Sequence, residues 1–245
     1  SLGFRDRLFA VLGGSAALGE WMASHPGSWL ALWDETAMTS RPTRFGLRVS
    51  LQDAVAGLDG ASAPDALRVA YRTYVLRLAA RDLCGDLLID DVAAELSDLA
   101  DATLGAALKI AEAEHPAAAR LAVIAMGKCG GRELNYVSDV DVIFVAEPAD
   151  PESAARAAAM MRACSDTTPE GTIWPVDAAL RPEGKAGPLV RTLASHVGYY
   201  ERWASTWEFQ ALLKARAVAG DLALGEAYVA AVTPMVWQAA ARPSF

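Results

Sequence analysis

The sequence predicts an α+β fold in which helices precede and follow a small mixed sheet, and three observations indicate it. Apolar residues recur at helical spacing through much of residues 1–118. Two extended apolar runs, 121–126 and 140–145, are separated by a glycine-rich turn, which is typical of buried strands. A third run, 173–180, alternates as a further strand. We expect three parts: a helical N-terminal region at 1–118, a core at 119–193, and C-terminal helices packing on the core at 194–245.

Composition indicates a globular protein and argues against two classes of partner. Of the 245 residues, 53% are hydrophobic and 21% are charged, which is enough apolar material for a sizeable core. The formal net charge is −8, so the chain has no general attraction for nucleic acid or for an anionic membrane. We expect neither partner, while a small phosphate-bearing ligand in a local basic pocket stays open.

Cysteine usage and the distribution of charge predict a soluble cytoplasmic protein. Cys84, Cys129 and Cys164 lie far apart and form no Cys-x-x-Cys pair, so neither a disulfide framework nor a zinc site is expected. Residues 1–14 carry charges among their apolar positions, unlike a secretion signal. No apolar run reaches the roughly 18 residues of a membrane span.

The first part of the chain is predicted to form short helices over 1–40 and longer ones at about 65–84 and 90–114. Gly85 ends the first long helix, and His115-Pro116 ends the second. In the short helices we expect these residues to pack in a core: Trp29, Leu30, Leu32 and Trp33.

Five acids lie on the helix expected at 90–114. Negative charge near a helix N-terminus is favourable, so we interpret them as a solvated face and not as metal ligands. They are Asp90, Asp91, Glu95, Asp98 and Asp101.

The elements after the two apolar strands are expected in a simple order. They are a helix at 152–164, a turn at 166–172, the strand at 173–180 with Pro175 favouring an edge position, a Pro- and Gly-rich loop at 181–192, and two helices at about 194–220 and 221–240. The aromatic residues Trp203, Trp207 and Phe209 are expected in the core and not as a base-stacking platform.

The glycine turn between the two apolar strands is a candidate anion site. Gly127, Gly130 and Gly131 break the strand at what is predicted to be a helix N-terminus. Glycine lets backbone amides approach an anion closely there, and the amides are unsatisfied at a helix start. Lys128 has little structural purpose inside such a turn, so we expect it to contact a phosphate. Cys129 is interpreted as a small packing residue.

Asp139 and Asp141 head the second strand. Strand positions i and i+2 share a face, with Cα atoms about 6.5 Å apart. Two carboxylates so placed can share a pair of cations about 3.5–4 Å apart, the geometry of two-metal phosphoryl or nucleotidyl transfer. An Asp-x-Asp string is also common in turns. Here it heads an apolar strand, where two charges are costly unless something pairs with them.

A third carboxylate and several basic residues follow. Asp177, in the strand at 173–180, either caps a turn or completes the metal-binding set. Arg181 and Lys185 lie on the loop after it, and Lys214 and Arg216 lie further on. For all four, ordinary surface charge competes with phosphate contact.

The string Gly-Lys-Cys-Gly-Gly-Arg-Glu-Leu-Asn-Tyr-Val-Ser-Asp-Val-Asp, 127–141, resembles the nucleotidyltransferase superfamily that includes DNA polymerase β. More narrowly, it resembles the family of bifunctional glutamine synthetase adenylyltransferase/adenylyl-removing enzymes. The helical strings Ala79-Ala80-Arg81-Asp82-Leu83 and 95–100, and the loop string Leu180-Arg181-Pro182, are similar to that family as well.

The resemblance implies a two-Mg²⁺ site and a set of nucleotide contacts. The implied metal-binding and catalytic residues are Asp139, Asp141 and Asp177; the implied contacts to nucleotide or phosphate are Gly130, Gly131, Lys128, Ser138, Arg181, Lys185, Lys214 and Arg216. Family members commonly carry another arginine where this chain has Ala179, which puts a phosphate contact or full catalytic strength in doubt.

The resemblance also implies a reaction and partners. Family enzymes carry two copies of this core, one transferring AMP from ATP to a tyrosine of glutamine synthetase and one removing it with inorganic phosphate to give ADP. The strings 187–190 and 199–202 are similar to the removing copy and 207–212 to the transferring copy. We expect adenylyl removal, with adenylyl transfer or a non-catalytic regulatory module as alternatives. Glutamine synthetase, the second catalytic half and a PII-type signal protein are the implied partners.

Overall fold

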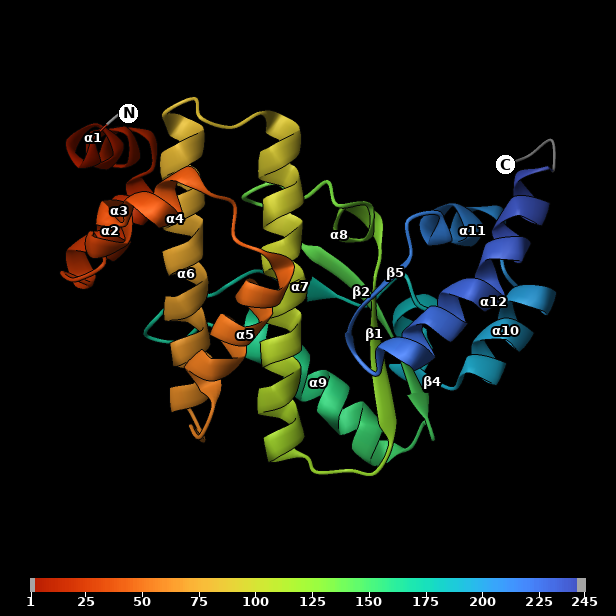
Figure 1. Ribbon diagram of the computed structural model, residues 1–245. Helices are drawn as coiled ribbons and strands as arrows, with labels where there is room; N and C mark the ends of the chain where they lie inside the picture. Colours follow the sequence, from red (N-terminus) through yellow and green to blue (C-terminus); the bar gives the residue numbers. More distant parts are fainter. Residues whose placement is uncertain (1–2, 242–245) are drawn as a thin grey trace.

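A computed structural model describes residues 3–241, and its centre is a five-stranded mixed sheet with helices on both faces (Figure 1). Hydrogen-bonded neighbours follow the order β3-β2-β1-β5, and β4 also pairs with β2. The pairs β1–β2 and β1–β5 are antiparallel, whereas β3 and β4 both run parallel to β2. The strands are β1 Arg120–Ala125, β2 Val140–Glu147, β3 Val176–Asp177, β4 Val190–Arg191 and β5 Arg216–Gly220. The α+β class is confirmed.

The central strands are apolar throughout because helices cover both faces of the sheet. Along β1, Leu121 and Val123 pack toward α7 and α9, while Ala122 and Ile124 pack toward α10, α11 and α12. Successive strand residues point to opposite faces, so a strand covered on both sides needs apolar residues at every position. The covering helices are α7 Ile89–Glu114, α9 Pro151–Ser165, α10 Leu193–Arg202, α11 Thr206–Leu212 and α12 Leu222–Ala240.

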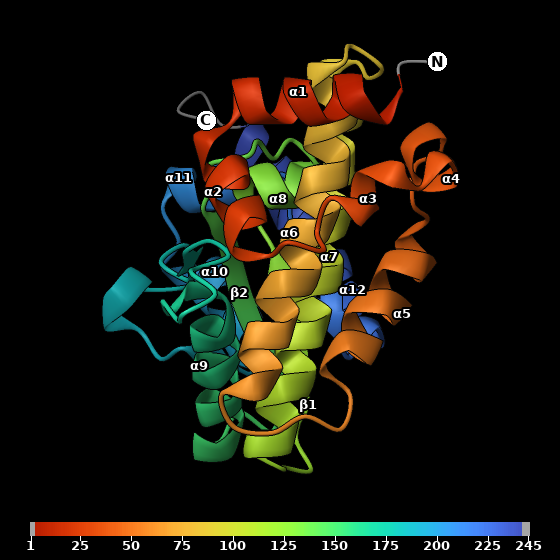
Figure 2. The ribbon, with the colours of Figure 1, turned by 90° about the vertical axis from the view of Figure 1, so that its left-hand side faces the viewer.

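The N-terminal helices form a separate layer beside α7. They pack around α6, and Figure 2 shows α1 crossing the end of α6 while α5 lies along its flank. Their own apolar cluster includes Leu32, Met38 and Leu76. The helices are α1 Phe4–Gly14, α2 Ala16–Ser24, α3 Leu30–Trp33, α4 Glu35–Thr39, α5 Arg44–Val55 and α6 Ser62–Leu83.

Local sequence accounts for several helix starts. The side chains of Ser15 and Thr43 accept hydrogen bonds from backbone N–H groups three residues on, which satisfies donors left open at the start of α2 and α5. Asp150 and Ser153 form a capping box ahead of α9, with Pro151 at the first helical position. These caps place the helix starts within a few residues of the predicted positions.

The helix predicted at 194–220 is wrong. The structure divides it into α10, α11 and strand β5, and a second capping box at Ser205 and Glu208 starts α11. β5 pairs with β1 from Ala122 to Ala125, and this satisfies the edge of β1 that faces away from β2. The strand predicted at 173–180 is shorter than expected, because only Val176 and Asp177 pair with β2, at the sheet edge that Pro175 favours. The three-part division of the chain stays a prediction.

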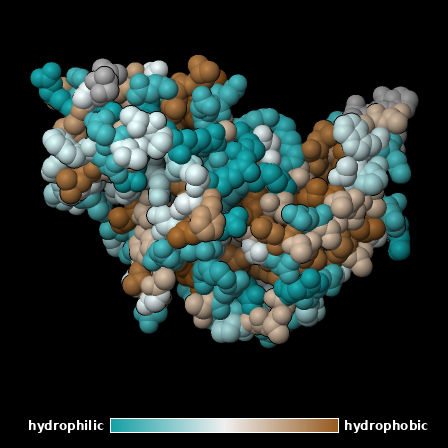
Figure 3. Space-filling model, in the orientation of Figure 1, coloured by the Kyte–Doolittle hydropathy of each residue, from teal (hydrophilic) through white to brown (hydrophobic). Residues whose placement is uncertain are grey.

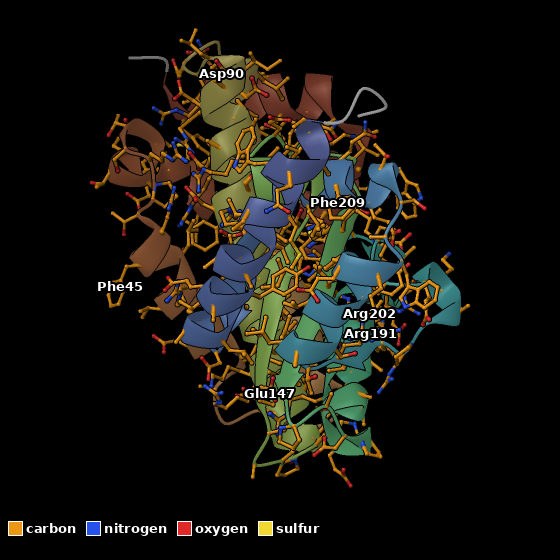
Figure 4. All side chains as sticks on the ribbon, turned by 90° about the vertical axis from the view of Figure 1, so that its right-hand side faces the viewer. Phe45, Asp90, Glu147, Arg191, Arg202 and Phe209 are labelled. Carbon is orange, nitrogen blue, oxygen red and sulfur yellow. The ribbon has the colours of Figure 1, made fainter. Side chains whose placement is uncertain are left out.

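The predicted core is wrong at several aromatic residues. Of the four expected in the short helices, Leu32 is buried, while Trp29, Leu30 and Trp33 are exposed because the short helices bury little more than one face of each turn. Trp203 and Trp207 are exposed as well. Phe209 is buried against α12, whereas Phe45 projects from the edge of the molecule (Figure 4). Among the helices that the structure describes, none is long and apolar enough to cross a bilayer.

Candidate active site

The glycine turn joins β1 to the head of β2. It forms the short helix α8, Gly127–Gly131, and the Met126 N–H donates to the Asp141 carbonyl at 2.9 Å, which fastens the turn to β2. Gly127 has φ +52°, and a Cβ there would lie 2.6 Å from Asp141 Oδ2. At Gly130 a Cβ would lie 2.1 Å from the Lys214 carbonyl oxygen. Glycine is required at both positions because backbone and carboxylate approach so closely.

Two adjacent strands bring the predicted carboxylates together. Asp141 and Asp177 are register partners in the parallel pair β2–β3. Asp139 lies directly before the first residue of β2. Asp139 is exposed and the other two are half-buried. Burial raises the pKa of Asp141, the charges of Asp139 and Asp177 raise it further, and the ammonium of Lys128 lowers it. Three negative groups therefore converge with one nearby cation to offset them.

Asp177 caps the turn that follows β3, which is the structural alternative to a catalytic role. Its Oδ1 accepts the Ala179 backbone N–H at 2.7 Å, so this carboxylate does cap the turn after β3. The same residue is the register partner of Asp141, so the two side chains lie on the same face of the paired strands. Capping and participation in the acidic site are compatible, since a carboxylate has two oxygens that accept several hydrogen bonds.

The basic residues proposed as phosphate contacts fall into two groups. Lys128 and Lys185 are exposed. By contrast, Lys214 pairs with Glu133 at 2.6 Å, and Arg181 donates to the carbonyls of Ala178, Lys185 and Gly187, which shapes the loop after β3.

Arg216 is tied to the scaffold. Its guanidinium makes a bidentate contact to Asp101 and donates to the carbonyls of Cys129 and Gly130. Ser138, directly before Asp139, is buried, and its hydroxyl has no hydrogen-bond partner in the described part of the chain.

The acids of α7 are not a solvated face, and that prediction is wrong for Glu95, Asp98 and Asp101. Asp98 is 4% exposed and forms ion pairs with Arg41 at 2.6 Å and Arg132 at 2.7 Å. It also pairs with Arg44 at 2.9 Å. Glu95 is buried against Arg81, and Asp101 holds Arg216. Asp90 and Asp91 are exposed as expected.

The signal that sequence reasoning missed is the spacing of three acids that are buried or mostly buried. Glu95, Asp98 and Asp101 are three residues apart, so they follow one side of the helix through its middle, where most neighbouring positions are apolar. Their arginine partners are remote in sequence, which is why no local pattern reveals the pairs.

The fit of a divalent cation depends on the donor chemistry of the acidic site. Within residues 3–241 no group of three or more His, Cys, Asp or Glu side chains is arranged to hold a metal ion by itself. Mg²⁺ rarely uses such an all-protein cage: it binds one or two carboxylates and completes its shell with water and substrate phosphates. The paired strands present hard oxygen donors of this kind at Asp141 and Asp177, with Asp139 beside them.

The outline of the molecule is indented beside α8, the helix that the glycine turn forms (Figure 3). The space-filling view is indented between the region of α8 and that of α11 and α12, and hydrophilic residues gather along the side nearer α7 and α8 (Figure 3). Hydrophobic residues are more prominent toward α12 (Figure 3). The glycine turn therefore lies next to an accessible, polar part of the surface.

A mixed sheet with a glycine turn after one central strand and carboxylates at the heads of two parallel neighbours defines an α+β fold of the nucleotidyltransferase type. The family model for glutamate-ammonia ligase adenylyltransferase matches residues 5–231, and the chain belongs to this family.

Curated relatives agree with the family model. The bifunctional glutamine synthetase adenylyltransferase/adenylyl-removing enzymes of Streptomyces avermitilis and Streptomyces coelicolor are 60% and 59% identical to this chain, each over 98% of it. The enzyme of the same name from Mycobacterium tuberculosis is 54% identical over 98% of the chain. The chain spans about a quarter of the length of these relatives, 24% to 25%.

Proposed function

We propose that this chain is a catalytic module that removes AMP from an adenylylated tyrosine of glutamine synthetase, with inorganic phosphate as the acceptor. The observation that carries the proposal is the pairing of Asp141 with Asp177 across β2 and β3, beside Asp139 and the glycine turn. The names of the relatives support glutamine synthetase as the target. The same proposal places the protein in the cytoplasm. Its further proposed partners are a second catalytic half and a PII-type signal protein.

The acidic site would hold Mg²⁺ through Asp139, Asp141 and Asp177. When bound, Mg²⁺ neutralises phosphate charge and stabilises the charge that develops during transfer. Burial first, and then the negative charges of Asp139 and Asp177, raise the pKa of Asp141, so a cation bound here would relieve an unfavourable charge. Lys128 and the amides of the turn at Gly130 and Gly131 would orient the phosphates of the nucleotide.

The reaction balances as a displacement at phosphorus. An oxygen of inorganic phosphate forms a bond to the α-phosphorus of adenylyl-tyrosine, and the bond from that phosphorus to the tyrosyl oxygen breaks. The phenolate takes up a proton, and the products are ADP and unmodified tyrosine. In this arrangement the task of Lys128 and the turn is to hold both phosphate groups in line, since positioning and charge stabilisation dominate such transfers.

Adenylyl transfer from ATP is the second candidate, because the same kind of site suits attack of a tyrosine oxygen on the α-phosphorus of ATP with pyrophosphate as the leaving group. The string 207–212 favours it, and Trp207 and Gln210 of that string are exposed on α11. A non-catalytic module that binds nucleotide or glutamine synthetase is the third alternative. Three acids with a single offsetting lysine argue for chemistry over binding alone.

The test uses adenylylated glutamine synthetase, Mg²⁺ and inorganic phosphate, with loss of the AMP group followed by mass. Loss that requires phosphate, yields ADP and disappears in Asp139→Asn supports adenylyl removal. Asp53→Asn is the matched control, since Asp53 is an exposed acid on α5. AMP gain on unmodified glutamine synthetase with ATP, without loss in the first assay, makes transfer the activity. Silence in both assays contradicts an independent catalytic module.

A further inference from the structure

The carbonyl end of the glycine turn is held by an arginine from a different strand. At Arg216, Nη2 donates to the Cys129 carbonyl at 2.9 Å and Nε to the Gly130 carbonyl at 3.2 Å. These carbonyls lie at the end of α8, where helical partners run out. The guanidinium donates to both carbonyls and so ties the end of the turn to β5.

Asp101 of α7 fixes this arginine in turn. Its Oδ2 lies 2.5 Å from Nη1 of Arg216 and its Oδ1 lies 3.0 Å from Nη2. A bidentate contact between carboxylate and guanidinium defines the plane of the guanidinium as well as its distance. Both side chains are mostly buried, with relative exposures of 27% for Arg216 and 18% for Asp101.

A second arginine holds the residue that follows the turn. Arg132 adopts a left-handed conformation with φ +61°, and its N–H donates to the Cys129 carbonyl at 3.2 Å. Its guanidinium reaches Asp98, one turn of α7 away from Asp101. Two successive turns of α7 thus anchor the end of α8 through separate ion pairs.

The glycine turn is closely packed at two points, one against Asp141 and one against the backbone of Lys214. The spacing between Gly127 and Asp141 admits no Cβ, and the spacing between Gly130 and the Lys214 carbonyl admits none either. A shift of the turn changes its approach to Asp141, because the space between Gly127 and this carboxylate is too small even for a Cβ. Precise placement of this kind is what transfer between phosphates requires.

We propose that Asp101 and Arg216 are a positioning pair, which acts through the carbonyls of Cys129 and Gly130 to hold the glycine turn against Asp141. The inference rests on the proposed function, and it gives Arg216 a task other than phosphate contact. The two roles predict opposite outcomes when Asp101 loses its charge. A phosphate-binding arginine released from Asp101 binds nucleotide at least as well, whereas a positioning arginine without its anchor loses turnover.

The test is a double-mutant cycle with Asp101→Asn and Arg216→Lys, measured as kcat and KM for the phosphate or nucleotide substrate. Each single variant is expected to lower kcat about tenfold, and the double variant is expected to lie within about twofold of the poorer single one, because residues that act as a unit are not additive. Additive losses near a hundredfold, or an unchanged kcat in Asp101→Asn, overturn the proposal.

Glu95→Gln is the matched control. It removes a buried ion pair to Arg81 from the same helix without touching the glycine turn. If loss of stability alone explained the effect, this variant would lower kcat as Asp101→Asn does. We expect its kcat at saturating substrate to equal that of the wild type at a temperature where both are folded.

Hydrogen exchange separates failure of this inference from failure of the proposed function. Amides of the segment 127–133 are expected to exchange about tenfold faster in Asp101→Asn and at the wild-type rate in Glu95→Gln. A wild type without turnover in either direction contradicts the proposed function, and the exchange rates still decide whether the pair holds the turn. Equal exchange in both variants overturns the positioning pair.

Discussion

Asp98 on α7 and Asp141 on β2 have pKa values shifted in opposite directions. Asp98 belongs to the helical scaffold, and Asp141 belongs to the candidate active site. Asp98 is the more buried of the two and is surrounded by Arg41, Arg44 and Arg132. Burial acts to raise its pKa, but the hydrogen bonds and charges of these arginines outweigh burial and hold the pKa below its ordinary value. Asp141 is half-buried, faces two further carboxylates and has its pKa raised.

The difference teaches that the number of cationic partners decides whether burial raises the pKa of an acid on α7. Glu95 and Asp101 each face a single close arginine, and for both the effect of burial prevails and raises the pKa. Asp98 has enough partners to reverse that effect. At Asp141 the neighbouring residues add negative charge, which is the arrangement expected where a cationic ligand is to be bound.

The largest expected effect is on activity, from Asp141→Asn. Removing one carboxylate from the acidic site should lower kcat by about 100- to 1000-fold, the range found when one stabilising group of a transition state is lost. The melting temperature should stay level or rise, because the substitution removes a repelled charge. Activity assays with thermal unfolding check both statements. A variant with lower stability would contradict the view that Asp141 is held against repulsion.

The second effect is on stability, from Asp98→Asn. Breaking a buried ion pair by removing one partner leaves uncompensated arginines, so the free energy of unfolding should fall by about 3 kcal/mol. Urea unfolding with an unchanged slope checks it. The control is Asp90→Asn at the exposed start of α7 (Figure 4), which should lie within about 0.5 kcal/mol of the wild type. An equal loss in both variants would remove the distinction between the two faces of α7.

The smallest expected effect is on the pH dependence of the free energy of unfolding, which should differ in sign between the contributions of Asp98 and Asp141. The pKa of Asp98 is lowered in the folded state, so its stabilisation is complete above the ordinary value of 3.8 and is lost as the pH falls through the folded-state pKa. The pKa of Asp141 is raised, so the wild type loses stability as the pH rises through the window from 3.8 to the raised value.

Unfolding free energies measured from pH 7 downward check this contrast. The deficit of Asp98→Asn should be constant to about pH 4 and shrink below it. Any advantage of Asp141→Asn should be present at neutral pH and vanish on acidification. Parallel profiles for the two variants would mean that the two aspartates do not differ as described.

Sequence patterns predicted most of the helices and both central strands, and they failed where long-range pairing decides. The long helices α6 and α7 follow from apolar spacing and nearby Gly or Pro, and β1 and β2 follow from apolar runs beside a glycine turn. Strand β5 was missed because residues 216–220 become a strand only by pairing with β1. The short strand β3 depends in the same way on β2.

Sequence alone determined the α+β class and the proximity of Asp139 and Asp141 to the glycine turn, because strand alternation and glycine geometry are local properties. Tertiary structure decided everything that depends on partners distant along the chain. It set Asp177 beside Asp141, buried Asp98 among arginines from two distant segments, and paired Arg216 with Asp101. The charge state of an acid is set by the groups that surround it in space, and no local pattern of residues records them.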